Sequence, residues 1–133
     1  MSKLSIVIRC YNEEEHIGRL LSGIMQQTVK DVEVVIVDSG STDATLSIAS
    51  RYPIRVVHIA PQEFSFGRSL NRGCAAATGD ILVFASAHVY PLYDDWLEKL
   101  VRPFDDPGDD WKDVSLFPTW FHWYAPHAAE RYG

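Results

Sequence analysis

Four short, nearly continuous apolar runs, separated by segments with helical periodicity, limit the fold classes open to this chain. The runs are Leu4–Ile8, Val32–Val37, Ile54–Ile59 and Ile81–Ala85. Strands that are apolar at almost every position are typical of parallel sheets, because helices cover both faces of such sheets. Alternation of strands with helices is the pattern of βαβ units. The sequence therefore predicts an α/β fold with a mostly parallel sheet and helices on both faces.

Length and composition restrict the class of protein further. The 133 residues suit about one domain, and 47% hydrophobic with 23% charged residues is typical of a globular chain. The net charge of −6 argues against a surface that binds nucleic acid or anionic lipid. No apolar stretch approaches the roughly 20 residues of a membrane span. Cys10 and Cys74 show neither metal-ligand nor disulfide spacing, so we expect reduced thiols and a cytoplasmic location.

Start and stop signals predict four helices. In the first, Asn12 is the expected N-cap, with Glu13–Glu15 in the first turn and Glu15 at capping-box spacing. The third is expected to end at Gly79 in the left-handed conformation, and the fourth before Pro103. The second, third and fourth helices are expected at about 41–51, 68–78 and 93–101.

The segments that follow the strands are polar. In an open parallel sheet, ligands bind beyond the carboxyl ends of the strands, where strand order reverses. Three such segments would converge there; they are Arg9–Glu13 after the first strand, Asp38–Asp43 after the second and Ser86–His88 after the fourth. The sequence therefore predicts a ligand site at this edge of the sheet.

Tyr11 and Asp38 are candidate nucleoside-binding residues. The Tyr11 ring offers a stacking face for a base, and the Asp38 carboxylate can accept a hydrogen bond from a base or ribose. The alternative is that Tyr11 covers the helix entrance, Asp38 caps the next turn and Glu13 completes the helix cap. The spacing leaves both interpretations open.

Arg68 and His88 are further candidates. Arg68, Asn71 and Arg72 share one helix face, so a guanidinium could approach a diphosphate, although such a face is often simply solvated. An imidazole at His88, just past a strand, can ligate a divalent metal or contact a phosphate oxygen. A lone histidine is more often structural, and the other four histidines lack ligand spacing.

Several segments in the same order resemble the amino-terminal half of family 2 glycosyltransferases. They are residues 5–13, 27–28, 35–43, 66–73 and 77–84, and the resemblance covers about residues 3–104. It implies a GT-A fold, a Rossmann-like sheet that binds a nucleotide-diphosphate sugar, usually with Mg²⁺ or Mn²⁺. It also implies transfer of the sugar to an acceptor with inversion at the anomeric carbon.

The resemblance assigns roles to single residues. Tyr11 would stack on the base, Asp38 would contact its edge and Arg68 would lie near the nucleotide. Asn12, Glu13, Ser86 and His88 complete the expected substrate-binding set. The family's metal-binding Asp-x-Asp should follow Phe84-Ala85, where this sequence has Ser86-Ala87-His88. His88 is the candidate metal ligand, and without the carboxylates we expect weaker, Mn²⁺-like or metal-free binding.

The chain is expected to divide into a nucleotide-sugar-binding domain, residues 1–104, and an acidic, aromatic-rich tail, residues 105–133. We expect the tail to pack on the domain or on a partner, and a homodimer through the tail is one such arrangement. Asp110 is a candidate general base, and a solvated acidic loop is the alternative. Two functions follow: a glycosyltransferase whose acceptor half comes from the tail or a partner, or a truncated, non-catalytic nucleotide-binding or assembly module.

Overall fold

The structure, a computed structural model, describes residues 3–105 and 121–124 and contains a five-stranded sheet. The strand order is β3-β2-β1-β4-β5. The first four strands pair in parallel, and β5 pairs antiparallel to β4. The strands are β1 (Leu4–Cys10), β2 (Val32–Asp38), β3 (Arg55–His58), β4 (Ile81–Ser86) and β5 (Phe121–Tyr124). The predicted α/β fold with a mostly parallel sheet is confirmed.

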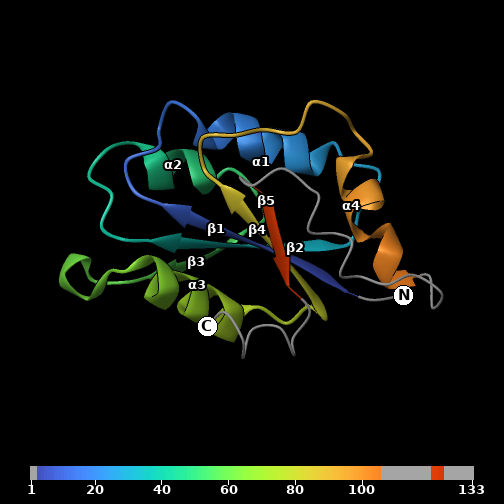
Figure 1. The fold of residues 1–133 in the computed structure, drawn as a ribbon. Helices are drawn as coiled ribbons and strands as arrows, with labels where there is room; N and C mark the ends of the chain where they lie inside the picture. The colour runs from blue at the N-terminus through green and yellow to red at the C-terminus, as the bar shows by residue number, and fades with distance from the viewer. Residues whose placement is uncertain (1–2, 106–120, 125–133) are drawn as a thin grey trace.

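Helices lie on both faces of this sheet (Figure 1). Helices α1, α2 and α4 cover one face, and α3 covers the other. A short 3-10 helix, η1, precedes α3. The helices are α1 (Ile17–Met25), α2 (Thr45–Ala49), η1 (Pro61–Glu63), α3 (Phe66–Ala76) and α4 (Trp96–Asp105). No helix among the described residues is long and apolar enough to cross a membrane.

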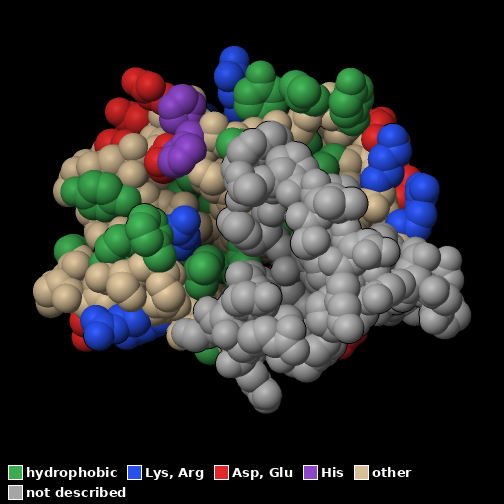
Figure 2. Space-filling view, viewed as in Figure 1, with side chains coloured by type: hydrophobic (Ala, Val, Ile, Leu, Met, Phe, Trp, Pro, Cys, Tyr) green, Lys and Arg blue, Asp and Glu red, His purple; other side chains and the backbone are tan. Residues whose placement is uncertain are grey.

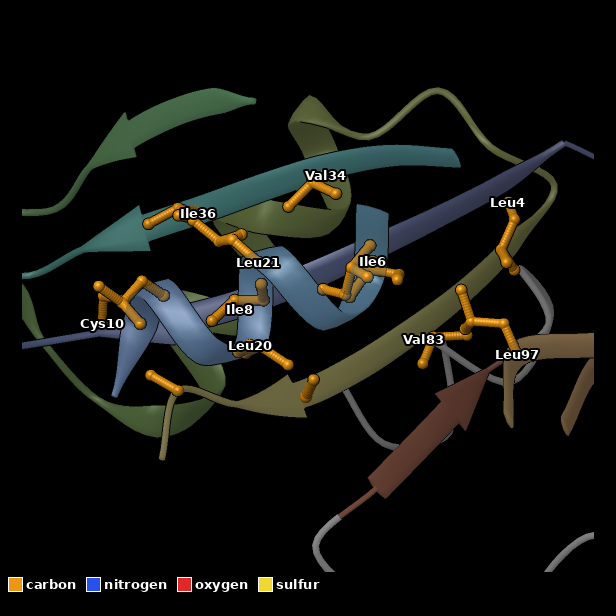
Figure 3. Packing of buried hydrophobic residues seen from close by; sticks show 14 of the residues in the cluster. Leu4, Ile6, Ile8, Cys10, Leu20, Leu21, Val34, Ile36, Val83 and Leu97 are labelled. Atoms are coloured by element: carbon orange, nitrogen blue, oxygen red, sulfur yellow. The ribbon is translucent and has the colours of Figure 1, made fainter. Parts of the chain in front are cut away.

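The core explains why the strands are apolar at nearly every position. In β1, Ile6 and Ile8 pack toward α1 while Val7 packs toward α3, and all three are fully buried. Leu20 and Leu21 of α1 close the first cluster (Figure 3). Burial of each such side chain contributes about 1.5–3 kcal/mol. Both faces of the sheet therefore require apolar residues.

The predicted start of the first helix was wrong. Helix α1 begins at Ile17, and no side chain caps it. Asn12 instead has a left-handed backbone, with φ of 50°, and its side chain accepts hydrogen bonds from the amides of Thr42 and Asp43. Glu13 accepts the amide hydrogen bond of Ile17 through its backbone carbonyl. Asn12 thus connects two loops and does not cap its own helix.

The other helix boundaries moved for identifiable reasons. Helix α2 is shorter than predicted because Asp43 accepts the amide hydrogen bond of Thr45 and so sets its start. Ser65 caps α3 by accepting from the amide of Arg68, which starts this helix earlier than predicted. Helix α4 continues past Pro103 to Asp105, so this proline does not end the helix.

Gly79 does not end α3 in the left-handed conformation, which was a wrong prediction. Within the described residues, Gly40 is the one glycine with a positive φ, 99°. A Cβ at Gly79 would lie 2.8 Å from the amide nitrogen of Ser5 and 3.0 Å from the carbonyl oxygen of Lys3. The glycine is therefore required by close approach of two chain segments.

Gln27 joins α1 to α4 at the edge of the sheet opposite the candidate site. Its side chain is buried, and its amide nitrogen donates to the carbonyls of Gly23 and Tyr93 at 3.2 and 2.8 Å. Its side-chain oxygen accepts the amide of Leu97 at 3.0 Å, near the start of α4. Gln27, one of the residues that carry the resemblance, thus has a structural role.

The tail contributes one described strand. β5 pairs with β4 in the register Leu82–Tyr124 to Ala85–Phe121 and extends the sheet at its edge. The sequence had no periodicity from which this strand could be predicted. The other residues of the segment 106–133, Asp110 included, lie outside the described residues.

Candidate functional site

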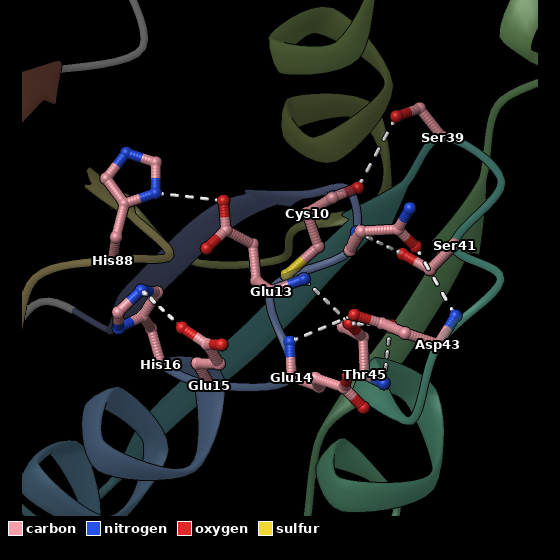
Figure 4. A network of polar contacts seen from close by, with 11 residues as sticks. Cys10, Glu13, Glu14, Glu15, His16, Ser39, Ser41, Asp43, Thr45 and His88 are labelled. Atoms are coloured by element: carbon pink, nitrogen blue, oxygen red, sulfur yellow. Dashed lines mark hydrogen bonds and ion pairs between the residues drawn. The ribbon is translucent and has the colours of Figure 1, made fainter.

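The loops after β1 and β2 are joined by side chain to backbone hydrogen bonds (Figure 4). The Asn12 amide donates to Ser41 Oγ at 2.9 Å, and Asn12 Oδ1 accepts from the Thr42 amide at 2.8 Å. The Glu13 amide donates to Thr45 Oγ1 at 2.8 Å. These contacts cross about thirty positions of sequence, and they hold the two loops in one fixed arrangement.

Two acids of the loops are used in the same structural network. The Glu14 amide donates to Asp43 Oδ2 at 3.2 Å, and Glu14 Oε2 accepts from the Ala44 amide at 3.1 Å. Although desolvation raises the pKa of the Asp43 carboxyl, hydrogen bonds from Thr45 and from backbone amides lower it below its ordinary value. The acids at 14 and 43 therefore stabilise the loops.

Asp38, at the end of β2, is buried and accepts three hydrogen bonds from its own loop. Oδ2 accepts the amides of Gly40 and Ser41, both at 3.0 Å, and Oδ1 accepts the Ser41 hydroxyl. The positive φ of Gly40 shapes this turn. Asp38 thus caps the turn, as one of the two sequence interpretations proposed. A carboxylate oxygen has two lone pairs, so Oδ1 keeps capacity for another donor, and the base contact stays a prediction.

His88 lies beside Glu13, and their contact joins the loop after β4 to the loop after β1. His88 Nδ1 is 2.9 Å from Glu13 Oε1; the histidine side chain is 60% exposed and the glutamate 17%. Because a carboxylate oxygen accepts, Nδ1 is the donor nitrogen of this contact, and Nε2 is the ring nitrogen left for another partner. The His16 ring lies 6.3 Å from that of His88, and Figure 2 shows the histidines next to acidic side chains. The contact with Glu13 therefore orients the His88 ring and leaves one ring nitrogen for another partner.

Tyr11 and Arg9 belong to the same edge. Tyr11 is 55% exposed, as a ring that stacks on a ligand must be. Arg9, which sequence reasoning left without a role, is half-buried near the end of β1. Its guanidinium carbon lies 4.2 Å from the centroid of the Phe66 ring. The sequence feature that could have identified Arg9 is its charge, at a position inside an otherwise apolar strand.

Arg68 lines a separate shallow depression on α3. Arg68 donates to the carbonyl of Glu63 at 3.3 Å, while Arg72 forms an ion pair with the Glu63 carboxylate at 3.0 Å and also donates to the carbonyl of His58. The depression encloses about 670 Å³, and its lining residues are Ile59, Glu63, Arg68, Asn71, Arg72 and Ala75. In the part of the chain that the structure describes, no hydrogen bond joins Arg68 to Asp38 or His88.

The donor atoms at this edge do not fit a metal site built from the protein alone. Among residues 3–105 and 121–124, no group of three or more histidine, cysteine or acidic side chains could hold a metal ion. Ser86 is neutral, and the Glu13 carboxylate is paired with His88. Burial, with the charges of Asp38, Glu13 and Asp43, raises the pKa of the Cys10 thiol to about 12, so this thiol stays protonated. His88 stays the candidate ligand that the sequence predicted.

Comparisons with known proteins agree with the fold. The family model described as Glycosyl transferase family 2 matches residues 5–117. The chain is 34% identical over 110 residues to the 4,4'-diaponeurosporenoate glycosyltransferase of Staphylococcus aureus, covering 80% of this chain and 29% of that protein. It is 34% identical over 89 residues to an uncharacterized glycosyltransferase of Nostoc sp., covering 64% and 28%. The chain thus spans less than a third of the length of these relatives.

Two solved structures illustrate the structural similarity. The mannosyltransferase PcManGT of Pyrobaculum calidifontis, in complex with GDP-Man and Mn²⁺, superposes with a TM-score of 0.83 at 24% identity, covering 99% of this chain and 47% of that one. Glucosyl-3-phosphoglycerate synthase of Mycobacterium tuberculosis, in complex with Mn²⁺ and UDP, gives 0.64 at 32% identity, covering 77% and 39%. Both structures share the Rossmann-like α/β fold of this chain.

Proposed function

Because the chain belongs to glycosyl transferase family 2, we propose that the edge formed by the loops after β1, β2 and β4 binds a nucleoside diphosphate sugar. The observation that carries the proposal is the joining of these loops. Asn12 contacts Ser41, Ser41 contacts Asp38, and Glu13 contacts His88. Parallel strands direct such loops to one edge, where α/β folds bind nucleotides. The bound sugar is then transferred to an acceptor with inversion, as the family resemblance implies.

Each side chain has a distinct part in donor binding. The exposed Tyr11 ring stacks on the base, and Asp38 Oδ1 accepts a donor group from the base or ribose. His88, whose Nδ1 lies 2.9 Å from Glu13 Oε1, completes the site from the loop after β4. Arg68 contributes positive charge from α3, since the Glu63 carboxylate neutralises Arg72 and not Arg68.

A divalent cation is used by related structures, two of which hold Mn²⁺. The donor set of this chain is poorer in oxygen than an Asp-x-Asp site, because Ser86 replaces a carboxylate and His88 supplies nitrogen. Hard ions such as Mg²⁺ prefer oxygen ligands. We therefore expect donor binding that depends weakly on metal, with Mn²⁺ preferred over Mg²⁺.

The acceptor side of the reaction belongs to residues that the structure does not describe or to a partner chain. Asp110 is the candidate base that would take the acceptor proton. A homodimer through residues 105–133 and a cytoplasmic location stay predictions. A non-catalytic nucleotide-binding module is the alternative, and it differs from the transferase in turnover alone.

A calorimetric panel tests this proposal. The 133-residue chain is titrated with UDP-, GDP- and dTDP-sugars, in EDTA and in Mn²⁺, and donor hydrolysis is followed in the same samples. We expect one nucleotide class to bind and to raise the melting temperature, because a ligand that binds the folded state stabilises it. Binding without hydrolysis or transfer supports the module. Absence of binding by every nucleotide contradicts both functions.

A substitution at Tyr11 tests where the nucleobase of the donor binds. Tyr11→Ala should weaken binding of the preferred nucleotide about 5- to 150-fold, because stacking of a base on an aromatic ring contributes about 1–3 kcal/mol. Tyr93→Ala is the control: Tyr93 is also exposed, but its carbonyl contacts Gln27 at the opposite edge of the sheet. Calorimetry should find Tyr93→Ala unchanged. Equal affinities for the two variants would remove Tyr11 from the site.

A further inference from the structure

Arg9 occupies a position that its neighbours do not explain. It follows Val7 on the face of β1 that packs toward α3, and it is paired in register with Ser86 of β4. Val7 and Phe84 lie two residues earlier on their strands and are buried against α3. Registered residues on neighbouring parallel strands are about 4.8 Å apart and point to the same face. The Arg9 and Ser86 side chains therefore start side by side at the carboxyl edge.

The guanidinium of Arg9 is held by an aromatic ring and not by a carboxylate. Its carbon lies 4.2 Å from the centre of the Phe66 ring, at the start of α3. Among the described residues, Arg9 makes no ion pair with an acid. Burial lowers the pKa of the Arg9 guanidinium, but an arginine remains charged. A half-buried cation whose desolvation is not offset by an anion is a site at which an anion gains affinity.

The neighbouring residue makes this charge informative. Ser86 stands where the resemblance places the first acid of an Asp-x-Asp motif, and an acid there would lie beside Arg9 and neutralise it. The serine leaves the guanidinium unpaired. A neutral side chain at Ser86 and an unpaired cation at Arg9 thus lie on adjacent strands, on the same face, at the same edge.

We infer that the Arg9 guanidinium, held against the Phe66 ring beside Ser86, binds the diphosphate of the donor and supplies positive charge that an Asp-x-Asp site would supply through a metal ion. The inference rests on the proposed function and adds to it the residue that recognises the diphosphate. The planar fork of arginine suits two phosphate oxygens, and the ring fixes its plane. Diphosphate binding should therefore persist in EDTA.

Inorganic pyrophosphate, titrated in EDTA, tests Arg9 apart from the base. Arg9→Gln should weaken pyrophosphate binding about 10- to 100-fold, because charge-assisted hydrogen bonds to the anion are lost. Arg19→Gln is the matched control, since it also removes one positive charge and one cation–π contact, 4.8 Å from the Tyr90 ring. Wild-type affinity is expected for the control. Equal affinities for wild type, Arg9→Gln and Arg19→Gln overturn the inference.

Two further variants keep the test valid if Arg9→Gln unfolds. Arg9→Lys keeps the charge but loses the fork, and Phe66→Leu keeps the arginine but removes its stacking partner. Each should weaken pyrophosphate binding severalfold, with circular dichroism as the check on folding. Binding of pyrophosphate that neither variant alters also overturns the inference. If nucleotide sugars fail to bind wild type while pyrophosphate binding still requires Arg9, the proposed function fails and the anion site stands.

Ser86→Asp provides the reciprocal experiment. A carboxylate beside Arg9 should pair with the guanidinium and weaken pyrophosphate binding in EDTA about tenfold or more. Mn²⁺ should restore part of this loss, because the carboxylate is a hard oxygen ligand. The same titration of Ser86→Ala, which adds no charge, should match wild type. A Ser86→Asp protein that binds pyrophosphate as tightly as wild type in EDTA would place the anion elsewhere.

Discussion

The two edges of the sheet are both rich in hydrogen bonds between strands, but they differ in what is left unpaired. At the amino edge, Glu33 accepts from Ser5 Oγ at 2.7 Å and from the amide and hydroxyl of Thr78 at 2.8 and 3.1 Å. Lys3 Nζ donates to the Thr78 hydroxyl at 2.7 Å. Gly79 donates its amide to Ser5 Oγ. The polar groups at this edge therefore form hydrogen bonds with one another.

The carboxyl edge has a similar network with groups to spare. Asn12, Asp38 and Asp43 hold the loops in place, as Glu33 does at the other edge. Among the described residues, however, the Arg9 guanidinium lies against the Phe66 ring without an acidic partner, and His88 contacts Glu13 through Nδ1. Buried polar groups are normally paired. The difference teaches that the two edges are distinguished by the charge and hydrogen-bonding capacity left unused, and not by the number of polar residues.

The largest loss of stability is expected from a substitution at the carboxyl edge of the sheet. Asp38→Ala leaves the amides of Gly40 and Ser41 without their acceptor, so the free energy of unfolding should fall by about 3 kcal/mol. Donor binding should be lost with the loop geometry. Urea unfolding and calorimetry measure the two effects. Asp38→Asn, which keeps an acceptor oxygen, should lose less stability, and an equal loss would contradict this reason.

The next largest loss of stability is expected from a substitution that disturbs the amino edge alone. Gly79→Ala introduces a Cβ 2.8 Å from the Ser5 amide nitrogen, which should lower the free energy of unfolding by about 2 kcal/mol. Nucleotide affinity of the folded protein should not change, since this edge is remote from the site. Gly67→Ala is the control, because a Cβ there meets no atom within 4 Å. It should be neutral or slightly stabilising. A loss of affinity in Gly79→Ala would show that the edges are coupled.

The smallest expected effect is a pH-dependent contribution of Glu33, at the amino edge, to the free energy of unfolding. Desolvation raises the pKa of the Glu33 carboxyl, but hydrogen bonds from Thr78 and Ser5 outweigh it and lower the pKa below its ordinary value of 4.5. A carboxyl whose folded-state pKa is lowered stabilises the protein above that ordinary value, and the contribution is lost as pH falls through the folded-state pKa. Because Glu33 is partly exposed, Glu33→Gln should cost about 1 kcal/mol at pH 7.

Urea unfolding of Glu33→Gln and wild type between pH 7 and pH 3 measures this contribution. The difference between the two proteins should shrink as the solution is acidified below pH 4.5. A difference that stays constant over this range would mean that the charge of Glu33 does not stabilise the fold.

Local sequence was sufficient for the four parallel strands and for the edge of the sheet at which their following loops lie. Residues such as Ile6 and Val7 are buried on opposite faces, so an unbroken apolar run predicted a strand covered by helices. Parallel pairing then placed Tyr11, Asp38 and His88 at one edge. The resemblance to family 2 rested on the same segments, and the family was confirmed. The assigned binding roles of these residues stay predictions.

Tertiary contacts decided which polar groups are used and which are free. Asn12 accepts the amide hydrogen bond of Thr42, 30 positions away. Glu13 contacts His88 across 75 positions, and the Phe66 ring covers Arg9. Burial periodicity is a local property of consecutive residues, whereas a hydrogen bond or a cation–π contact depends on which distant side chain the fold brings within a few ångströms. The loop-joining contacts of Asn12 and the contact of Arg9 with Phe66 therefore became evident from the packed chain alone.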